Sequence, residues 1–253
     1  MFKGHPKGLL AAALSNMGER FGYYIMNAVP VLFLCSKFGL SEGLSGTIYS
    51  CFYAGIYILA LVGGLIADRT QNYKGTIKTG LVIMATGYVI LSIPILATAG
   101  NTSWLLSLTC LALFLIAFGN GLFKGNLQAI VGQMYDDFEA EAAKNGPEAL
   151  KEAKDKRDAG FQIFYVFINV GGLIAPFVAP VLRQWWLGTN GMEYNAQLPA
   201  LCHEYINAAA TMAPEALANL QQLMESAGGQ IADMAAACQK YLQIFNEGIH
   251  YSF

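Results

Sequence analysis

Charged residues are scarce in this chain. Lys, Arg, Asp and Glu make up 13% of its 253 residues, whereas hydrophobic residues make up 55%. Soluble domains carry about 25% charged residues, so this composition indicates a membrane protein whose main surroundings are a lipid bilayer. The formal net charge of −2 offers no basic surface, which excludes nucleic acid as a partner.

Residues for enzymatic or metal chemistry are also few. The three histidines (His5, His203 and His250) all lie outside the long apolar stretches, and no Ser/His/Asp arrangement accompanies them. The five cysteines show no metal-ligand spacing. We therefore predict a protein that is not an enzyme and that binds no metal and no cofactor.

Five apolar stretches are long enough to cross a bilayer, which takes about 20 residues. The sequence thus predicts an all-α membrane protein with a transmembrane bundle over residues 1–183. No small-residue cleavage site ends a short apolar run near the N-terminus, so the first stretch is expected to be a retained span. The predicted spans cover about 9–35, 44–67, 77–97, 104–134 and 160–182.

The distribution of lysine and arginine predicts the orientation, because these residues accumulate on the cytoplasmic side. With the N-terminus in the cytoplasm, ten of them lie inside and three outside. The charged stretch 140–157 is then a cytoplasmic helical connection, interrupted by Asn145-Gly146-Pro147. The ten are Lys3, Lys7, Arg69, Lys74, Lys78, Lys144, Lys151, Lys154, Lys156 and Arg157, and the three are Lys37, Arg183 and Lys240.

Residues 184–253 differ in character from the bundle. Two amphipathic helices are predicted over 214–226 and 230–245, separated by Gly228-Gly229, and they form an outer-face helical hairpin. Cys202 and Cys238 would then lie in an oxidising compartment and could pair. Their spacing in the sequence does not show whether their Cα atoms come close enough.

The stretch Asn16–Tyr24 places Glu19 and Arg20 near the middle of the first span. Each charge at that depth costs about 2.5–3.5 kcal/mol, which indicates that both are used. Adjacent helix positions do not face each other, so we predict that the two side chains have separate partners. Lys124 is the other charged residue deep in a span, and a Glu19–Lys124 contact that a proton could break is expected. The alternative is a static ion pair that locks two helices together.

Four sequence blocks follow one another along the predicted spans: Asn16–Ile25, Gly63–Arg69, Gly119–Asn126 and Phe161–Gly171. Together they resemble the proton-dependent oligopeptide transporter family, a branch of the major facilitator superfamily. The first block is similar to the family's helix-one signature, E-x-x-E-R-F-x-Y-Y-G. The others resemble the loop motif after helix two, the helix-four block around a lysine, and the helix-five signature F-Y-x-x-I-N-x-G.

This resemblance implies roles for individual residues. Glu19, Arg20 and Lys124 would serve proton coupling, with Arg20 and Lys124 also contacting substrate. Asp68 and Arg69 would make gating contacts, or they are an ordinary flank of a span. The resemblance places the other substrate-binding positions at Tyr23, Tyr24, Asn27, Tyr57 and Asn169. Each tyrosine could instead be a buried aromatic residue with one hydrogen bond.

The sequence departs from the family pattern at two of these positions. Asn16 stands where the signature has its first glutamate, and Asn27 stands where the family commonly has a basic residue for the peptide carboxylate. The superfamily fold has twelve helices in two halves, whereas five spans are predicted here, the sixth helix being absent. We therefore expect a fragment that is inactive alone and needs a C-terminal transporter half.

The resemblance leads to one principal hypothesis and two alternatives. The principal hypothesis is the N-terminal half of a proton-coupled di/tripeptide symporter in the bacterial inner membrane, working by alternating access and driven by the proton gradient. The first alternative keeps the fold but carries a non-peptide metabolite or anion, which Asn16 and Asn27 would permit. The second is a membrane-embedded interaction protein.

Overall fold

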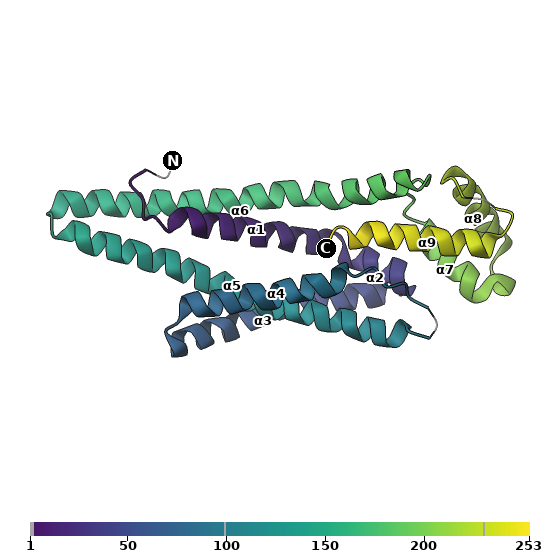
Figure 1. Ribbon diagram of the computed structural model, residues 1–253, viewed down its shortest axis with the longest axis horizontal. Helices are drawn as coiled ribbons and strands as arrows, with labels where there is room; N and C mark the ends of the chain where they lie inside the picture. The colour runs from purple at the N-terminus through teal and green to yellow at the C-terminus, as the bar shows by residue number, and fades with distance from the viewer. Residues whose placement is uncertain (1–2, 99, 230) are drawn as a thin grey trace. The chain divides into compact units, whose positions relative to one another are not determined.

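The chain is built of α-helices and short connections in a computed structural model that describes residues 3–98, 100–229 and 231–253 (Figure 1). A single 3-10 turn, η1 (Ala209–Thr211), interrupts the helices of the C-terminal part. The all-helical class that the sequence predicts is therefore confirmed for these residues. The helices are α1 (Leu9–Ala28), α2 (Pro30–Phe38), α3 (Glu42–Thr70), α4 (Tyr73–Ser92), α5 (Thr102–Ala143), α6 (Pro147–Thr189), α7 (Leu198–Ala208), α8 (Pro214–Ser226) and α9 (Met234–His250).

Several of these helices are suited to a membrane. In the described part of the chain, α3, α4, α5 and α6 are each long and apolar enough to cross a bilayer, and the bent pair α1–α2 supplies a possible fifth span. With 42 residues, α5 is about 63 Å long at 1.5 Å per residue. This is about twice the hydrocarbon thickness of about 30 Å, so α5 must extend well beyond the bilayer.

The chain divides into two compact units, each made of segments from several helices. The first unit contains Met1–Tyr24, Phe52–Tyr88 and Ala112–Ala175. Its core joins side chains of α1, α4, α5 and α6. The buried members of this core are Leu9, Ala12, Ala13, Ile77, Phe123, Leu127, Ile130, Val131, Tyr135 and Phe164.

Glycines allow the helices of the first unit to approach closely. A Cβ atom at Gly63 of α3 would lie 2.3 Å from the carbonyl oxygen of Gly121 in α5, so only glycine fits there. Gly171 of α6 is packed in the same way, because an added Cβ atom would lie 2.5 Å from the carbonyl oxygen of Met17 in α1. Gly64, in contrast, faces open space. Close helix packing thus depends on Gly63 and Gly171 but not on Gly64.

The second unit contains Ile25–Cys51, Val89–Leu111 and Pro176–Phe253. Here the predicted first span, about 9–35, is divided into two helices, with a bend of 48° between α1 and α2. Pro30 explains the bend, since proline has no N–H and its ring clashes with the preceding turn of a helix. The helix then ends at Gly39, whose left-handed φ of 64° suits glycine.

The other predicted span boundaries need smaller corrections. Helix α4 stops at Ser92 rather than near residue 97, because the next residues, Ile93-Pro94, cannot continue a helix. The predicted interruption at Asn145-Gly146-Pro147 is confirmed, with α5 ending at Ala143 and α6 beginning at Pro147. Helix α6 then runs without a break through the charged connection and the fifth predicted span.

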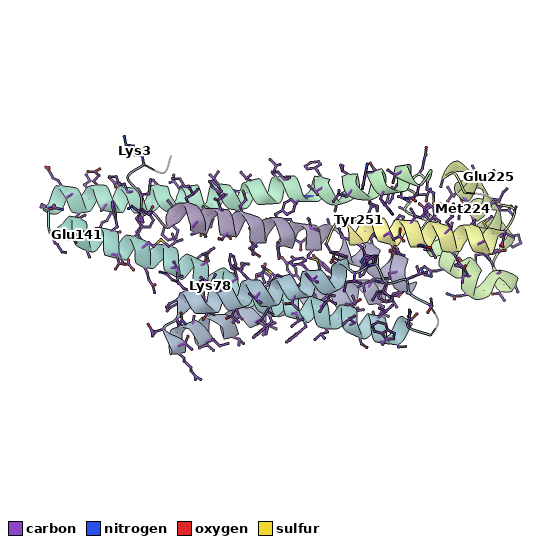
Figure 2. The ribbon with its side chains drawn as sticks, viewed as in Figure 1. Lys3, Lys78, Glu141, Met224, Glu225 and Tyr251 are labelled. Atoms are coloured by element: carbon purple, nitrogen blue, oxygen red, sulfur yellow. The ribbon has the colours of Figure 1, made fainter. Side chains whose placement is uncertain are left out.

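The C-terminal part contains three helices rather than the predicted two. The prediction of a helix over 214–226 is confirmed by α8, but α9 begins at Met234, and residue 230 lies outside the described residues. Helix α7 was missed, although Pro199 at its start is a typical helix-start signal. Figure 2 shows Met224 and Glu225 of α8, of which Met224 is fully buried and Glu225 is exposed, as expected for an amphipathic helix.

Candidate functional site: a buried ion pair in the first unit

Glu19 and Arg20 of α1 form a two-point ion pair. Arg20 Nε donates to Glu19 Oε2 at 2.5 Å, and Arg20 Nη2 donates to Glu19 Oε1 at 2.8 Å. The side chain of Glu19 is 0% exposed and that of Arg20 is 9% exposed. The prediction that these adjacent residues have separate partners is therefore wrong. The long arginine side chain can turn back along the helix, so the guanidinium reaches the carboxylate although the two Cβ atoms point in different directions.

Asn120 of α5 completes the surroundings of Glu19. Its Nδ2 donates to Glu19 Oε1, and the residue is 2% exposed. Its Oδ1 is buried and has no hydrogen-bond partner among the described residues. The sequence reasoning did not single out Asn120, although it lies four residues before Lys124 and so shares a helix face with that lysine.

Lys124 contacts an aromatic ring instead of the predicted carboxylate. Its Nζ lies 4.8 Å from the ring centroid of Tyr57, the geometry of a cation–π contact. None of the ion pairs within the described residues includes Lys124. The expected Glu19–Lys124 pair is thus wrong for this conformation, because Arg20 and Asn120 already occupy both carboxylate oxygens of Glu19.

Three tyrosines lie next to these charges. The Tyr23 ring is 7% exposed and is covered by the Arg20 guanidinium, at 4.5 Å from the ring centroid. Tyr53 and Tyr57 of α3 are partly open, and their hydroxyl oxygens are 3.2 Å apart. Tyr23 is in side-chain hydrogen-bonding contact with both. Tyr53 was missed by the sequence reasoning, although it lies one helical turn before Tyr57.

The remaining predicted pocket residues lie in other surroundings. Tyr24 packs on Gly172 of α6, where an added Cβ atom would lie 2.6 Å from the tyrosine ring. Asn169 of α6 is exposed, and its side chain takes part in no hydrogen bond among the described residues. Asn27 belongs to the second unit, where its Oδ1 accepts a hydrogen bond from the Tyr49 hydroxyl at 3.0 Å.

The predicted gating pair is found at the end of α3. Asp68 and Arg69 are both exposed, and Asp68 Oδ1 accepts a hydrogen bond of 2.6 Å from the Tyr73 hydroxyl of α4. Asp68 therefore links two consecutive helices across a tight connection. Gln71, with a left-handed φ of 51°, makes the turn between them.

The cluster in the first unit combines one acid, two cations and several hydroxyl groups. A carboxylate held by a guanidinium and an amide can take up a proton, and protonation would remove the charge that holds Arg20. A guanidinium released in this way can bind another carboxylate through two hydrogen bonds. No group of three or more His, Cys, Asp or Glu side chains within the described ranges could hold a metal ion.

Comparison with known proteins gives a family for this arrangement. The family model PTR2, described as the POT family, matches residues 74–202. A peptide transporter of Yersinia enterocolitica, YePEPT, is 32% identical over 76% of this chain, and a di-/tripeptide transporter of Lactococcus lactis subsp. cremoris is 33% identical over 72% of it. The chain spans about a third of the length of these curated relatives, at 34% and 33% of each.

Solved structures agree with the sequence comparison. A crystal structure of a mutant of the peptide transporter POT in complex with sulfate is 31% identical, with a TM-score of 0.56. The match covers 89% of this chain and 45% of that one. The helical architecture, the charged helix-one cluster and these matches lead to one conclusion: the chain belongs to the POT family of transporters.

Proposed function

We propose that this chain is the first helical bundle of a proton-coupled di- and tripeptide symporter that works by alternating access. The observation that carries this proposal is the ion pair between Glu19 and Arg20, buried inside a helix that is expected to cross the membrane. A permanent structural role would be served at lower cost by apolar residues of similar size. A titratable acid at this position is explained if its protonation is a step of the transport cycle.

Uptake of a proton by Glu19 is the coupling step. Protonation neutralises the carboxylate and weakens its hold on Arg20, so the guanidinium becomes free to bind the carboxylate of a peptide. Lys124 supplies a second cation, held near Tyr57 until a stronger anionic partner arrives. Tyr23, Tyr53 and Tyr57 offer hydroxyl groups that can both donate to and accept from peptide bonds. Release of the peptide then allows Arg20 to return to Glu19 and expel the proton.

The orientation that we propose has the N-terminus in the cytoplasm of the cell. Lysine and arginine are in excess in the N-terminal segment and in the connections after the second and fourth predicted spans, which supports this orientation. The division into units supports it as well. The first unit holds the N-terminus and the connections near residues 71 and 145, whereas the second holds the connection near residue 40 and the whole tail. The membrane would be the bacterial plasma membrane, and the coupling ion would be the proton, with no other cofactor.

The complete transporter needs more than these helices. In alternating access two bundles move against each other around a central site, and the matches to this chain cover only about a third of longer relatives. We therefore propose that the transport activity belongs to the full protein containing this chain, with a C-terminal bundle as its partner.

The test uses the complete open reading frame, reconstituted in liposomes with an imposed pH gradient. Labelled dipeptide uptake is measured for the parent protein and for the Glu19→Gln and Lys124→Ala variants. We expect uptake to collapse in both, while the exposed lysine variant Lys78→Ala retains it. Unchanged uptake in both site variants would exclude the mechanism.

The nature of the cargo needs a separate measurement. Asn27 replaces the basic residue that members of this family commonly use for the peptide carboxylate, which favours a non-peptide metabolite or anion as a second candidate. Competition of dipeptide uptake by a panel of small anions distinguishes the two. An Asn27→Arg variant should bind dipeptides more tightly if a peptide is the cargo, and a loss of dipeptide competition in that variant would argue against it.

A further inference from the structure

Cys202 of α7 and Cys238 of α9 lie against each other in the core of the C-terminal part. Both residues are 0% exposed, and their side chains are hydrogen-bonding neighbours. Among the described helices, α7 makes its most extensive contact with α9. The C-terminal part holds further side chains that are fully buried, namely Leu198, Leu220, Met224, Tyr241 and Phe245.

The other cysteines have different surroundings. Cys51 of α3 and Cys110 of α5 are exposed, and both lie in helices apolar enough to cross a membrane. Cys35 donates a hydrogen bond to Ser45 Oγ at 3.3 Å. Within the described chain, Cys202 and Cys238 are therefore the two thiols that share a buried contact. They join α7 to α9, which are separated in sequence by α8.

We propose that Cys202 and Cys238 form a disulfide that ties α7 to α9 when the tail folds on the outer side of the membrane. This inference rests on the orientation given above, because disulfides persist in oxidising compartments and not in the cytoplasm. It adds a covalent modification to a part of the chain that the mechanism proposed above does not use.

In the docked tail, the contact with Cys238 and burial raise the pKa of Cys202, and the hydrogen bond from Cys202 lowers the pKa of Cys238. Full burial of both sulfur atoms means that the exchange with an external disulfide takes place before α7 has docked on α9. The thiolate is the reactive form of either cysteine, and in the undocked tail both thiols are open to solvent.

The oxidant is the disulfide of a thiol–disulfide oxidoreductase in the outer compartment. The thiolate of one tail cysteine attacks one sulfur of that disulfide, which forms a mixed disulfide and releases the other sulfur as a thiolate. The second tail cysteine then loses its proton to solvent and attacks the tail sulfur of the mixed disulfide, which releases the second thiolate of the oxidoreductase. Two thiols of this chain lose two protons and two electrons, and one disulfide of the oxidoreductase is reduced to two thiols.

Differential alkylation of the full-length protein tests this inference. Cells are quenched in acid, the denatured protein is alkylated with a light reagent, and after reduction it is alkylated with a heavy one before peptide mapping. We expect the heavy label on Cys202 and Cys238 and the light label on Cys51 and Cys110. In a Cys202→Ser variant, Cys238 should change to the light label, whereas a Cys51→Ser control should leave the heavy labels in place. Light label on both tail cysteines of the parent protein overturns the disulfide.

A second measurement separates the disulfide from the orientation on which it rests. Ser226 of α8 is exposed, so a Ser226→Cys variant reports the side of the membrane through a membrane-impermeant maleimide added to intact cells. Labelling of this site together with free Cys202 and Cys238 overturns the disulfide alone. No labelling in intact cells, but labelling after lysis, places the tail inside and overturns the orientation as well. Dipeptide uptake by the same cells reports the transport proposal independently.

Discussion

The two units of the chain bury cationic side chains with different kinds of partner. In the first unit, Arg20 is paired with the carboxylate of Glu19. In the second, Lys37 Nζ lies 3.0 Å from His250 Nε2, and the Arg183 guanidinium lies 4.3 Å from the Tyr194 ring centroid. Neither Lys37 nor Arg183 belongs to any ion pair within the residues that the structure describes.

This difference separates a cation whose partner is charged from cations whose partners are neutral. A cation paired with a carboxylate loses its partner's charge when one proton binds, whereas a cation held by an aromatic ring or a neutral imidazole has no charged partner to lose. The first unit therefore holds the acid to which we assign proton coupling in the proposed mechanism. In the second unit, Lys37 joins α2 to α9, and Arg183 joins α6 to the rings of Tyr194 and Phe245.

The largest expected effect is on the stability of the first unit. Replacing Glu19 by Ala leaves the guanidinium of Arg20 buried without a carboxylate, which should lower the free energy of unfolding by about 3–5 kcal/mol. Glu19→Gln should cost less, because its amide oxygen still accepts hydrogen bonds from Arg20. Thermal unfolding of the purified protein in detergent compares the two. Negligible losses in both variants would mean that the ion pair contributes little.

The next effect is a pH dependence in the second unit. Burial and the Lys37 ammonium lower the pKa of His250 to about 4, and only the Leu91 carbonyl acts in the opposite direction. The neutral ring fits its partners, since Nδ1 can donate to Leu91 O at 2.6 Å while Nε2 accepts from Lys37. The contribution of neutral His250 to the free energy of unfolding is complete above about pH 6.5, the pKa of histidine in the unfolded chain. It is lost as the pH falls toward 4, and the loss is about 2.5 kcal/mol at pH 4.5.

Denaturation at pH 7 and at pH 4.5 measures this effect. A His250→Gln variant lacks the titrating ring, so its loss of stability between the two pH values should be smaller than that of the parent protein. The same loss in both proteins would assign the pH dependence to other groups.

A medium effect is expected from the helix contacts of the first unit. Gly63→Ala places a methyl group against the backbone of Gly121 and should cost about 1–3 kcal/mol through overpacking. Gly64→Ala is the matched control, because it faces open space and should be neutral or slightly stabilising. Both are measured by thermal unfolding. A Gly64→Ala loss as large as that of Gly63→Ala would contradict the contact.

The smallest effect is expected for Lys37→Met. Replacing a buried cation that lacks a carboxylate partner by an apolar side chain of similar length should change stability by about 1 kcal/mol or less. Proton-driven uptake by the complete transporter should remain, in contrast to the Lys124→Ala variant. If Lys37→Met abolished uptake, the division of roles between the two units would be wrong.

The sequence predicted the helices of this protein better than it predicted the contacts between side chains. Apolar runs and the Asn145-Gly146-Pro147 interruption gave most helices within a few residues, because length and helix breakers act locally. The bend at Pro30 and the end of α4 before Pro94 were missed, since both prolines lie inside apolar runs that read as continuous. Helix α7 is short and mixed in composition, and its packing on α9 involves residues far along the chain.

The site shows a similar division. Glu19, Arg20 and Lys124 were identified because charged residues in an apolar span are unusual whatever their partners. Which of them pair could not be read from helix angles, because a flexible arginine side chain can reach around its own helix. Asn120 carries no charge, so nothing in the composition of its span drew attention to it.

Asn120 has a further consequence for the proposed cycle. A carboxylate needs donors around it, whereas a carboxylic acid also needs an acceptor for its new O–H. A primary amide offers both kinds of atom on one rotatable group. Asn120 now presents its Nδ2 to Glu19 and keeps an unused Oδ1 in the protein interior. A half-turn of this amide would accommodate either protonation state of Glu19, so a proton could be taken up in the interior before any helix has moved.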